Sequence, residues 1–455
     1  MKKAIALILS AVLSLMLLTA CGGKDDTPAP TTPAQPETNN TTTTTTTTTT
    51  EETTPDVTGE KVKLVFSVNE QPQLPLTFWQ GIADRYMAAN PDVLIEILPQ
   101  PPGEELYVFQ QTLLATGQFP DVMIMQNAPD FAAVGALLPF SDDELWFMND
   151  VNIGKIGGVQ YTAVNKFQVM GWFYNKGLFA DNGIEVPTTY QQFIDNCKVL
   201  EANNVTPIVF SAMTGWTHMF LGNEVVGTDL LAKDPNWGIK RNKDEVKFEN
   251  DTLIGAFEKY QYIAQNFTGD YLTTLGSWEE VMAEFFAGKA AMHNMGSWFN
   301  GIIRDMINSG ELSIDIGWFP MPGDNNNNVV NAFLQEGYAI SATTKHPEIA
   351  KDFVTFLFTD VETYTYFLAS EQLFNPTKLP IEYEMTALRI EMGKFVEQAH
   401  IVEGFESMSG DNSFLPGLKD YYTGIMTQEI ALGRDVREAL RDLDAEWEIA
   451  NSLLR

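Results

Sequence analysis

The chain has 455 residues, and its 60 acidic side chains outnumber 28 basic ones, giving a formal charge of −32. Because nucleic acids are polyanions that proteins bind through lysine and arginine, this balance argues against a nucleic-acid partner. Two cysteines are too few for a disulfide-stapled scaffold, so stability must come from a hydrophobic core.

The N-terminus has the layout of a secretory signal. Lys2 and Lys3 precede an uncharged run over residues 4–20, which ends at Cys21. Residues 18–21, Leu-Thr-Ala-Cys, resemble the bacterial lipobox, in which the cysteine is acylated and becomes the new N-terminus. We therefore expect residues 1–20 to be removed, which moves the formal charge from −32 to −34, and Cys21 to carry a lipid anchor. A retained transmembrane helix is the weaker alternative, because the apolar run is short.

Residues 21–58 are expected to form a disordered linker behind the lipidated cysteine. They contain several prolines and a run of threonines over residues 41–50, with almost no large apolar side chain. A flexible chain of this length has a root-mean-square reach of roughly 30 to 35 Å. No cluster of lysine and arginine follows the anchor, so the acyl chains alone must hold the protein at a membrane.

If Cys21 carries lipid, Cys197 has no partner for an intramolecular disulfide. Cys197 lies at helical spacing from Phe193 and Leu200, which indicates a buried thiol without a chemical role.

From about Glu60 the composition becomes globular, and nearly 400 residues are too many for one core of ordinary size. We therefore expect two lobes. The patterns along the first part predict an α/β sheet, with strands at residues 62–68, 93–98 and 121–125 and helices at 77–89 and 104–116.

The later part repeats this alternation. Helices are predicted at residues 189–203 and 251–267, and a strand at 207–210. Ser277 and Glu280 have the spacing of a capping box, which predicts a helix that begins there and ends at Gly288. From Thr386 onward the pattern is mostly that of amphipathic helix.

Taken together, the segments from residue 60 to 455 resemble the family 1 extracellular solute-binding proteins, the maltose-binding-protein-like group. The segments that carry the resemblance are KLVFSV from Lys63, GQFPDVMIM around Pro120, GWFYNKGLFADNGIEVPTTYQQFIDNCKVL from Gly171, FFAGKAAMHNMGSW from Phe285, DIGWFPMPG from Asp315, and EGYAIS followed by TKHPEIAKDFVTFL. Each segment alone is a weak signal, and their shared order and spacing make a strong one.

The resemblance implies an α/β, two-lobed, periplasmic-binding-protein-like (type II) fold with a hinge and an interlobe cleft. By analogy, residues 60–167 plus 327–372 form lobe 1, and residues 168–326 plus 373–455 form lobe 2. The implied partners are a small solute held in the cleft and the transmembrane subunits of an ABC permease, and the protein is expected to be a monomer.

Polar residues that follow predicted strands are candidates for ligand contacts, because an α/β sheet binds ligands beyond the carboxyl ends of its strands. Asn69, Glu70 and Gln71 follow the first strand, and Gln126 and Asn127 follow the third. The alternative for the first group is an ordinary polar turn. For the second group, the resemblance also implies hydrogen bonds to ligand.

Four further candidates rest on the resemblance. Trp298 and Trp216 resemble positions where an indole stacks on a sugar ring, whose apolar face packs well on an aromatic surface. Gln168 and Glu336 resemble polar cleft positions. Packing at a helix entry is the alternative for Trp298, and a solvated surface group is the alternative for Gln168 and Glu336. Trp172 and Tyr174 are expected in the core.

The sequence carries no recognisable catalytic or metal motif. Its four histidines lack paired-ligand spacing, and no nucleophile elbow, Walker A loop or dinucleotide fingerprint occurs, so no cofactor or metal is expected. We expect a carbohydrate-binding lipoprotein of an ABC importer, not an enzyme, at the outer face of the bacterial cytoplasmic membrane. The alternatives are a lipid-anchored glycoside hydrolase, a surface adhesin, or a binding protein for a polyamine, a metal complex or a peptide.

Overall fold

The computed structural model describes residues 61–71, 73–102, 104–214, 217–325, 328–333, 336–415 and 417–454. By its internal contacts the chain divides into residues 1–58 and 59–455, and every described residue belongs to the second unit. The predicted signal, Cys21 and the linker therefore lie outside the described residues, as does Trp216. No helix among the described residues is both long and apolar enough to cross a bilayer.

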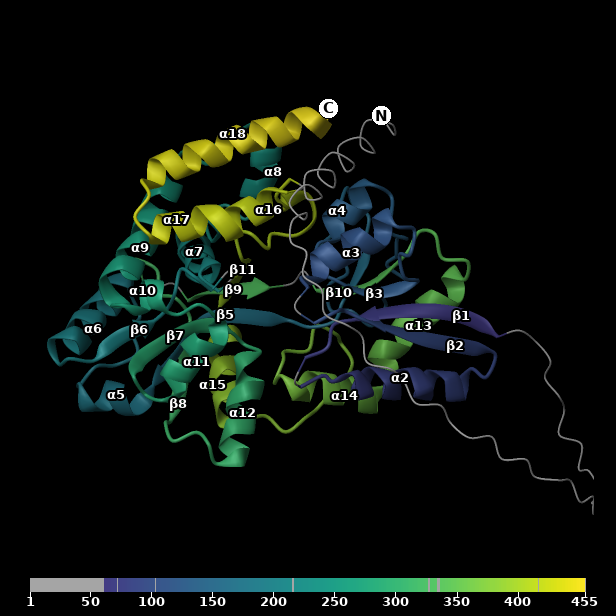
Figure 1. The fold of residues 1–455 in the computed structure, drawn as a ribbon, viewed down its shortest axis with the longest axis horizontal. Coiled ribbons are helices and arrows are strands. Elements are labelled where there is room, and N and C mark those ends of the chain that lie inside the picture. Colours follow the sequence, from purple (N-terminus) through teal and green to yellow (C-terminus); the bar gives the residue numbers. More distant parts are fainter. Residues whose placement is uncertain are drawn as a thin grey trace, which may run out of the picture. The chain divides into compact units, whose positions relative to one another are not determined.

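The described strands form two sheets (Figure 1). The first has five strands in the order β2-β1-β3-β10-β4. They are β1 (Val62–Val68), β2 (Val93–Pro99), β3 (Val122–Met125), β4 (Thr162–Val164) and β10 (Gly337–Ile340). Because β1 runs parallel to both β2 and β3, the carboxyl ends of these strands meet at one edge of the sheet. The strand β10 is antiparallel to β3 and β4.

The second sheet has six strands in the order β11-β9-β5-β7-β6, with β8 also paired to β5. They are β5 (Gln168–Asn175), β6 (Thr206–Val209), β7 (Ala290–Gly296), β8 (Ile316–Phe319), β9 (Val329–Phe333) and β11 (His400–Glu403). All eight residues of β5 are buried, which fits a central strand that is covered on both faces. Trp172 and Tyr174 lie on this strand, and their predicted place in the core is confirmed.

Helices cover both faces of each sheet (Figure 1). The first sheet is accompanied by α2 (Leu76–Ala89), α3 (Leu106–Ala115), α4 (Ala128–Ala133), α13 (Pro347–Thr359) and α14 (Val361–Ser370). The second is accompanied by α5 (Lys176–Asp181), α6 (Tyr190–Ala202), α7 (Met219–Val226), α8 (Trp237–Asn242), α9 (Asp251–Phe267), α10 (Tyr271–Thr274), α11 (Trp278–Phe286), α12 (Phe299–Ser309), α15 (Ala387–Val396), α16 (Leu418–Tyr421), α17 (Thr427–Ala431) and α18 (Val436–Leu454). Single turns lie at η1 (Gly227–Leu231), η2 (Gly410–Asn412) and η3 (Tyr422–Met426). We call the first sheet with its helices the first lobe, and the second sheet with its helices the second lobe.

The helix and strand predictions agree closely with these bounds. The Ser277 hydroxyl accepts a hydrogen bond from the Glu280 amide at 3.3 Å, so α11 begins at the predicted cap. Cys197 is fully buried in α6, and burial raises the pKa of its thiol well above the ordinary value, as expected for a thiol without chemistry. The region after Thr386 is mostly helical, as predicted, and it also contains the short strand β11.

The chain passes between the lobes at residues 165–167, between β4 and β5, then between β9 and β10, and again after α14. The strand β9 pairs with β5 and β11 of the second sheet, although the expected boundary at residue 327 assigns it to lobe 1. The chain therefore returns from the second sheet to the first after β9, a few residues later than the boundary that the resemblance implies.

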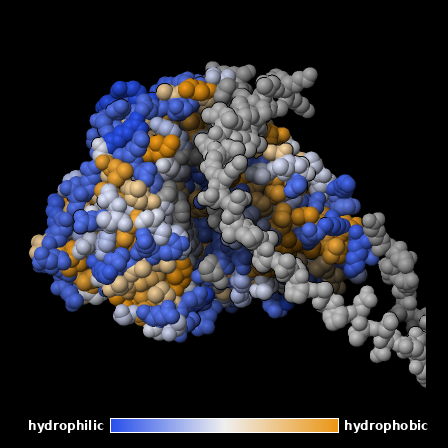
Figure 2. All heavy atoms as spheres, viewed as in Figure 1, coloured by the Kyte–Doolittle hydropathy of each residue, from blue (hydrophilic) through white to orange (hydrophobic). Residues whose placement is uncertain are grey.

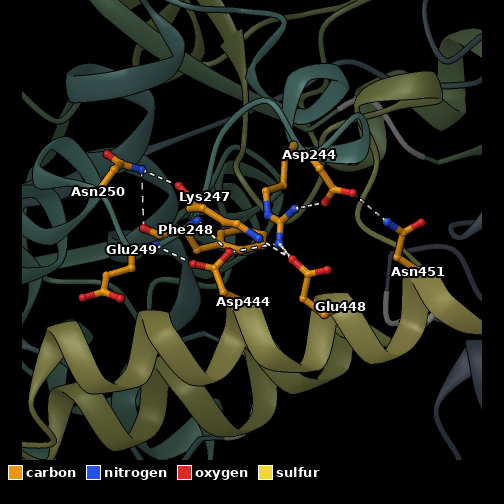
Figure 3. Close-up of polar contacts among 9 residues, drawn as sticks. Asp244, Lys247, Phe248, Glu249, Asn250, Asp444, Glu448 and Asn451 are labelled. Carbon is orange, nitrogen blue, oxygen red and sulfur yellow. Dashed lines mark hydrogen bonds and ion pairs between the residues drawn. The ribbon is translucent and has the colours of Figure 1, made fainter.

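The helix α18 is attached to the rest of the second lobe through Asp444 (Figure 3), which forms an ion pair with a buried arginine. The guanidinium of Arg241 is fully buried, lies 3.0 Å from both Asp244 and Asp444, and faces the rings of Phe248 and Trp447 at 5.3 and 5.0 Å. Asp444 also accepts the backbone amides of Phe248 at 3.0 Å and Glu249 at 2.8 Å. Figure 2 shows both blue and orange spheres where α18 lies, and the buried face of this helix carries Leu440, Leu443 and Trp447.

Candidate functional site

The predicted site residues after β1 and β3 lie where those parallel strands end, at one edge of the first sheet. Asn69 and Gln71 are half-buried, whereas Glu70 is exposed. One oxygen of Glu70 accepts the backbone amide of Leu76 at 3.3 Å, at the start of α2. Gln71 pairs with Leu74 through two backbone hydrogen bonds in a tight turn. These contacts place Glu70 and Gln71 in the turn that leads from β1 into α2.

Gln126 and Glu336 are brought together by the fold. The Gln126 side-chain amide donates to Oε2 of Glu336 at 3.1 Å, although the two residues are far apart in the sequence. Glu336 is only 6% exposed, so it is not the solvated surface group that the alternative assumed. Its other oxygen, Oε1, lies 2.8 Å from Nζ of Lys166.

Lys166 joins residues from different crossing segments. It lies between β4 and β5, Glu336 precedes β10, and Glu371 follows α14, where its Oε2 is 3.6 Å from the same ammonium group. Burial alone would lower the pKa of Lys166, but the two carboxylates outweigh it and raise the pKa. Burial raises the pKa of Glu371, and Lys166 offsets only part of that effect. We call Lys166, Glu336 and Glu371 the crossing cluster.

Gln168, another predicted site residue, follows Lys166 of the crossing cluster closely in the sequence. Gln168 is 5% exposed and begins β5, two residues beyond Lys166. The backbone amide of the next residue, Val169, donates a hydrogen bond to the Ser297 hydroxyl at 3.1 Å, and the Val169 carbonyl accepts one from the Ser297 amide at 2.8 Å. Ser297 directly precedes Trp298, so Gln168 and Trp298 come from neighbouring parts of the second lobe.

Trp298 is half-buried at the residue before α12, not enclosed in the core. Its ring packs edge-on against Phe220, with centroids 5.6 Å apart. A Cβ atom at Gly296 would lie 1.8 Å from the indole ring of Trp298. Only glycine at this position therefore lets the ring pack against the backbone of β7. The residue as a whole remains partly accessible, as a stacking position requires.

Asn127 meets the second lobe directly. Its Oδ1 atom accepts a hydrogen bond of 3.1 Å from Nζ of Lys419, which belongs to α16. Both residues line a small cavity between the lobes, with a volume of about 30 Å³. The principal side chains that line it are Tyr107, Asn127 and Asp130 from the first lobe, and Glu406, Phe414 and Lys419 from the second. A space of this size holds one or two water molecules, so any larger ligand requires the lobes to separate here.

Glu406 and Lys419 were not among the predicted site residues. Glu406 lies just beyond β11, and polar residues after strands were the signal that selected Asn69 and Gln126. That signal was missed because the region after Thr386 was expected to be mostly helical. Lys166 and Glu371 were missed because only the crossing of separate segments brings them to Glu336.

Comparison with known proteins identifies the family. Residues 71–363 match the family model described as bacterial extracellular solute-binding protein. The chain belongs to this family. A multiple sugar-binding protein of Streptococcus mutans is 26% identical over 216 residues, which cover 45% of this chain and 49% of that protein. An ABC transporter extracellular-binding protein of Pyrococcus horikoshii, uncharacterized by its name, is 25% identical over 321 residues, covering 66% of this chain and 67% of that protein. The alignment thus spans about half the length of the first relative and two thirds of the second.

Solved structures of solute-binding proteins share the fold. A chitin oligosaccharide binding protein superposes with a TM-score of 0.75 and 20% identity, covering 87% of this chain and all of that one. The solute-binding protein RafE in complex with raffinose gives a TM-score of 0.67 and 19% identity, covering 86% of this chain and all of that one. The predicted two-lobed type II fold is therefore confirmed, and the family membership agrees with the resemblance seen in the sequence.

Proposed function

We propose that this solute-binding protein captures a mono- or oligosaccharide between its lobes and delivers it to the permease of an ABC importer. The observation that carries the proposal is the cavity between the lobes, which the amide of Asn127 in the first lobe and the carboxyl group of Glu406 in the second lobe both line. Such groups can hydrogen-bond sugar hydroxyls, while the half-buried Trp298 supplies a surface for an apolar ring face. Related proteins that are named for sugars support the same class of solute.

A thermal-shift screen tests the class of solute. The compounds are raffinose, chitin oligosaccharides, maltotriose and simple hexoses, set against spermidine and a tripeptide. A ligand at 100 times its dissociation constant stabilises the folded state by roughly 2.7 kcal/mol, which a melting experiment resolves. Stabilisation by a sugar supports the proposal, whereas stabilisation by spermidine or the peptide alone contradicts the sugar class.

We propose that the protein binds its solute without catalysis. Both oxygens of Glu336 are engaged, one by Lys166 and one by Gln126, so this carboxylate serves to hold polar groups in place. Incubation of the protein with a binding oligosaccharide should return it unchanged in stoichiometric amount. Release of shorter sugars that is lost with Glu336→Gln or Glu406→Gln would instead indicate a glycoside hydrolase.

We also propose that the lobes close over the solute, since contacts from both lobes are made together only in the closed form. Small-angle scattering from the monomeric protein should show a smaller radius of gyration with saturating sugar. Identical curves would remove the closure mechanism.

The final part of the proposal is that Cys21 carries lipid and holds the protein at the outer face of the cytoplasmic membrane. Mass spectrometry of the N-terminal fragment from membranes should show an acylated Cys21 and no Met1. A Cys21→Ala protein that stays in the membrane fraction at the wild-type level would contradict it.

A further inference from the structure

Glu406 is a buried carboxyl group with an unusual set of partners. It is 1% exposed and follows β11 in the second lobe. Asn223 on α7 holds it from two sides: Nδ2 of Asn223 donates to Oε2 of Glu406 at 3.2 Å, and Oδ1 of Asn223 accepts the Glu406 amide at 3.3 Å. The hydroxyl of Tyr422 also donates to that Oδ1 atom, at 3.2 Å.

These contacts fix the orientation of Glu406 but use only one of its carboxyl oxygens. Among the described residues, Oε1 of Glu406 is buried and has no hydrogen-bond partner. A buried acceptor without a partner costs stability, so such a group in a native protein calls for an explanation. Because Asn223 donates to Oε2, a turn of the Glu406 carboxyl group toward another partner would break that hydrogen bond.

Glu406 lines the small cavity between the lobes, opposite Asn127 of the first lobe. A donor placed in this cavity would satisfy the free oxygen of Glu406. A side chain whose one oxygen is held by the protein and whose other oxygen is left for a ligand is pre-organised for binding.

We infer that Glu406 is a ligand-binding residue of the second lobe, and that its Oε1 atom accepts a hydrogen bond from a hydroxyl group of the bound solute. The hydroxyl rests on the proposed sugar function, whereas the role of Glu406 as an acceptor rests on its own geometry. The Lys419 to Asn127 hydrogen bond spans the same cavity, so it must open before the solute enters.

The test compares Glu406→Gln with Glu403→Gln. The glutamine at position 406 keeps a carbonyl oxygen for Asn223 and places an amide group, which cannot accept, where Oε1 was. Glu403 is a matched control because both of its oxygens are satisfied by Ser409, through the backbone amide at 2.8 Å and through the hydroxyl. Glu403 lines a different cavity, with Gly154 and Asn412, and not the one that Asn127 and Glu406 line.

Calorimetric titration with whichever sugar stabilises the wild-type protein gives the first result. Loss of a hydrogen bond to a carboxylate should weaken binding on the order of 10-fold to 100-fold for Glu406→Gln, with little change for Glu403→Gln. Equal affinities of Glu406→Gln and wild-type protein would overturn the inference.

Melting of the ligand-free variants gives a second result that needs no sugar. Glu406→Gln should melt close to the wild-type protein, because the oxygen it replaces has no hydrogen-bond partner among the described residues and loses only its attraction to Lys419. Glu403→Gln should melt lower, because the Ser409 contacts are disturbed. A drop for Glu406→Gln as large as that for Glu403→Gln would mean that both carboxyl oxygens of Glu406 are structural, and would overturn the inference even if no sugar in the screen binds and the proposed function fails.

Discussion

Two buried ionic clusters in this protein contain the same kinds of groups but differ in how far their acidic side chains are exposed to solvent. In the second lobe, Arg241 is fully buried, while its partners Asp444, Asp244 and Glu448 are 13%, 31% and 50% exposed. In the crossing cluster, Lys166, Glu336 and Glu371 are all between 4% and 7% exposed. The acids around Arg241 can reach water without their cation, whereas those around Lys166 cannot.

This difference indicates different roles. The Arg241 cluster joins α8 to α18 within one lobe and serves stability. The crossing cluster joins chain segments that run between the lobes, and Glu336 extends it to Gln126 at the cleft. A substitution in the crossing cluster should therefore alter both the segments between the lobes and the candidate site.

The largest expected effect is that of Lys166→Met. Removing the ammonium leaves Glu336 and Glu371 buried without a cation, which should lower the free energy of unfolding by roughly 3 to 5 kcal/mol at pH 8. The control is Lys259→Met, because Lys259 also lies between two carboxylates but is 20% exposed, with Asp324 at 63%. That control should cost less than about 1 kcal/mol in urea unfolding.

The cost of Lys166→Met should depend on pH in a definite direction. Burial already raises the pKa of Glu371 in the folded wild-type protein, and loss of Lys166 raises it further. The folded variant therefore keeps a proton that the unfolded chain releases above about pH 4.3, so its stability falls as the pH rises. Urea unfolding at pH 5 should show a smaller deficit than at pH 8, and equal deficits would contradict the role assigned to Lys166.

Arg241→Met should have the next largest effect. The acids around it stay partly solvated, so the cost comes mainly from lost packing between Phe248 and Trp447, about 2 to 4 kcal/mol in urea unfolding. Arg437→Met on α18, the helix that Arg241 contacts, is the control, because Arg437 is 52% exposed and should contribute little. A loss as large as that of Lys166→Met at pH 8 would remove the distinction between the clusters.

The contrast between the clusters could not be predicted from the sequence, although most elements could. The strand β1, the helices α2 and α9 and the buried Cys197 follow from local periodicity, which two or three turns of chain are enough to show. Lys166, Glu336 and Glu371 have no shared local pattern, because only the return of the chain between lobes brings them together.

The candidate site shows the same limit. Gln126 and Asn127 were identified because strand ends have a sequence signal, and Trp298 and Glu336 because the family resemblance points to them. Glu406 follows β11, a four-residue strand with a single buried residue, which leaves no apolar run to recognise. Its importance comes from Asn223, a partner on a distant helix.

A third prediction concerns a buried carboxyl group that has no cation partner among the described residues. Glu224 is fully buried, and burial raises its pKa to about 8, with a hydrogen bond from Asn294 opposing the shift. As the pH rises from about 4.3 toward 8, the unfolded chain loses this proton and the folded protein keeps it. Wild-type stability should then fall by at most about 1.4 kcal/mol per pH unit from this group.

Glu224→Gln removes that dependence, so the variant should gain stability over the wild-type protein by about 2 kcal/mol between pH 6 and pH 8. Urea unfolding at the two values measures the gain. Parallel stability curves would mean that Glu224 is not held protonated, and the contrast with the cation-paired glutamates of the crossing cluster would be lost.

The smallest expected effect concerns two tryptophans that extend the comparison from charges to rings. Trp447 is 1% exposed and packs on Arg241, whereas Trp298 is half-buried beside Gly296. If Trp298 stacks on a sugar, Trp298→Ala should weaken binding by about 1 to 3 kcal/mol. The variant lacks the indole face that the sugar would cover and remove from water. Its ligand-free melting temperature should change little, since part of the ring already lies in solvent.

Trp447→Ala is the matched control for the same loss of volume. It should cost roughly 3 to 5 kcal/mol of folding stability, because the ring fills the core under α18, while leaving sugar affinity unchanged in the protein that remains folded. Calorimetric titration and ligand-free melting of both variants separate the two roles. If Trp298→Ala binds sugar normally and melts as low as Trp447→Ala, then Trp298 belongs to the core, and the ligand contacts of the second lobe must come from polar groups such as Glu406 alone.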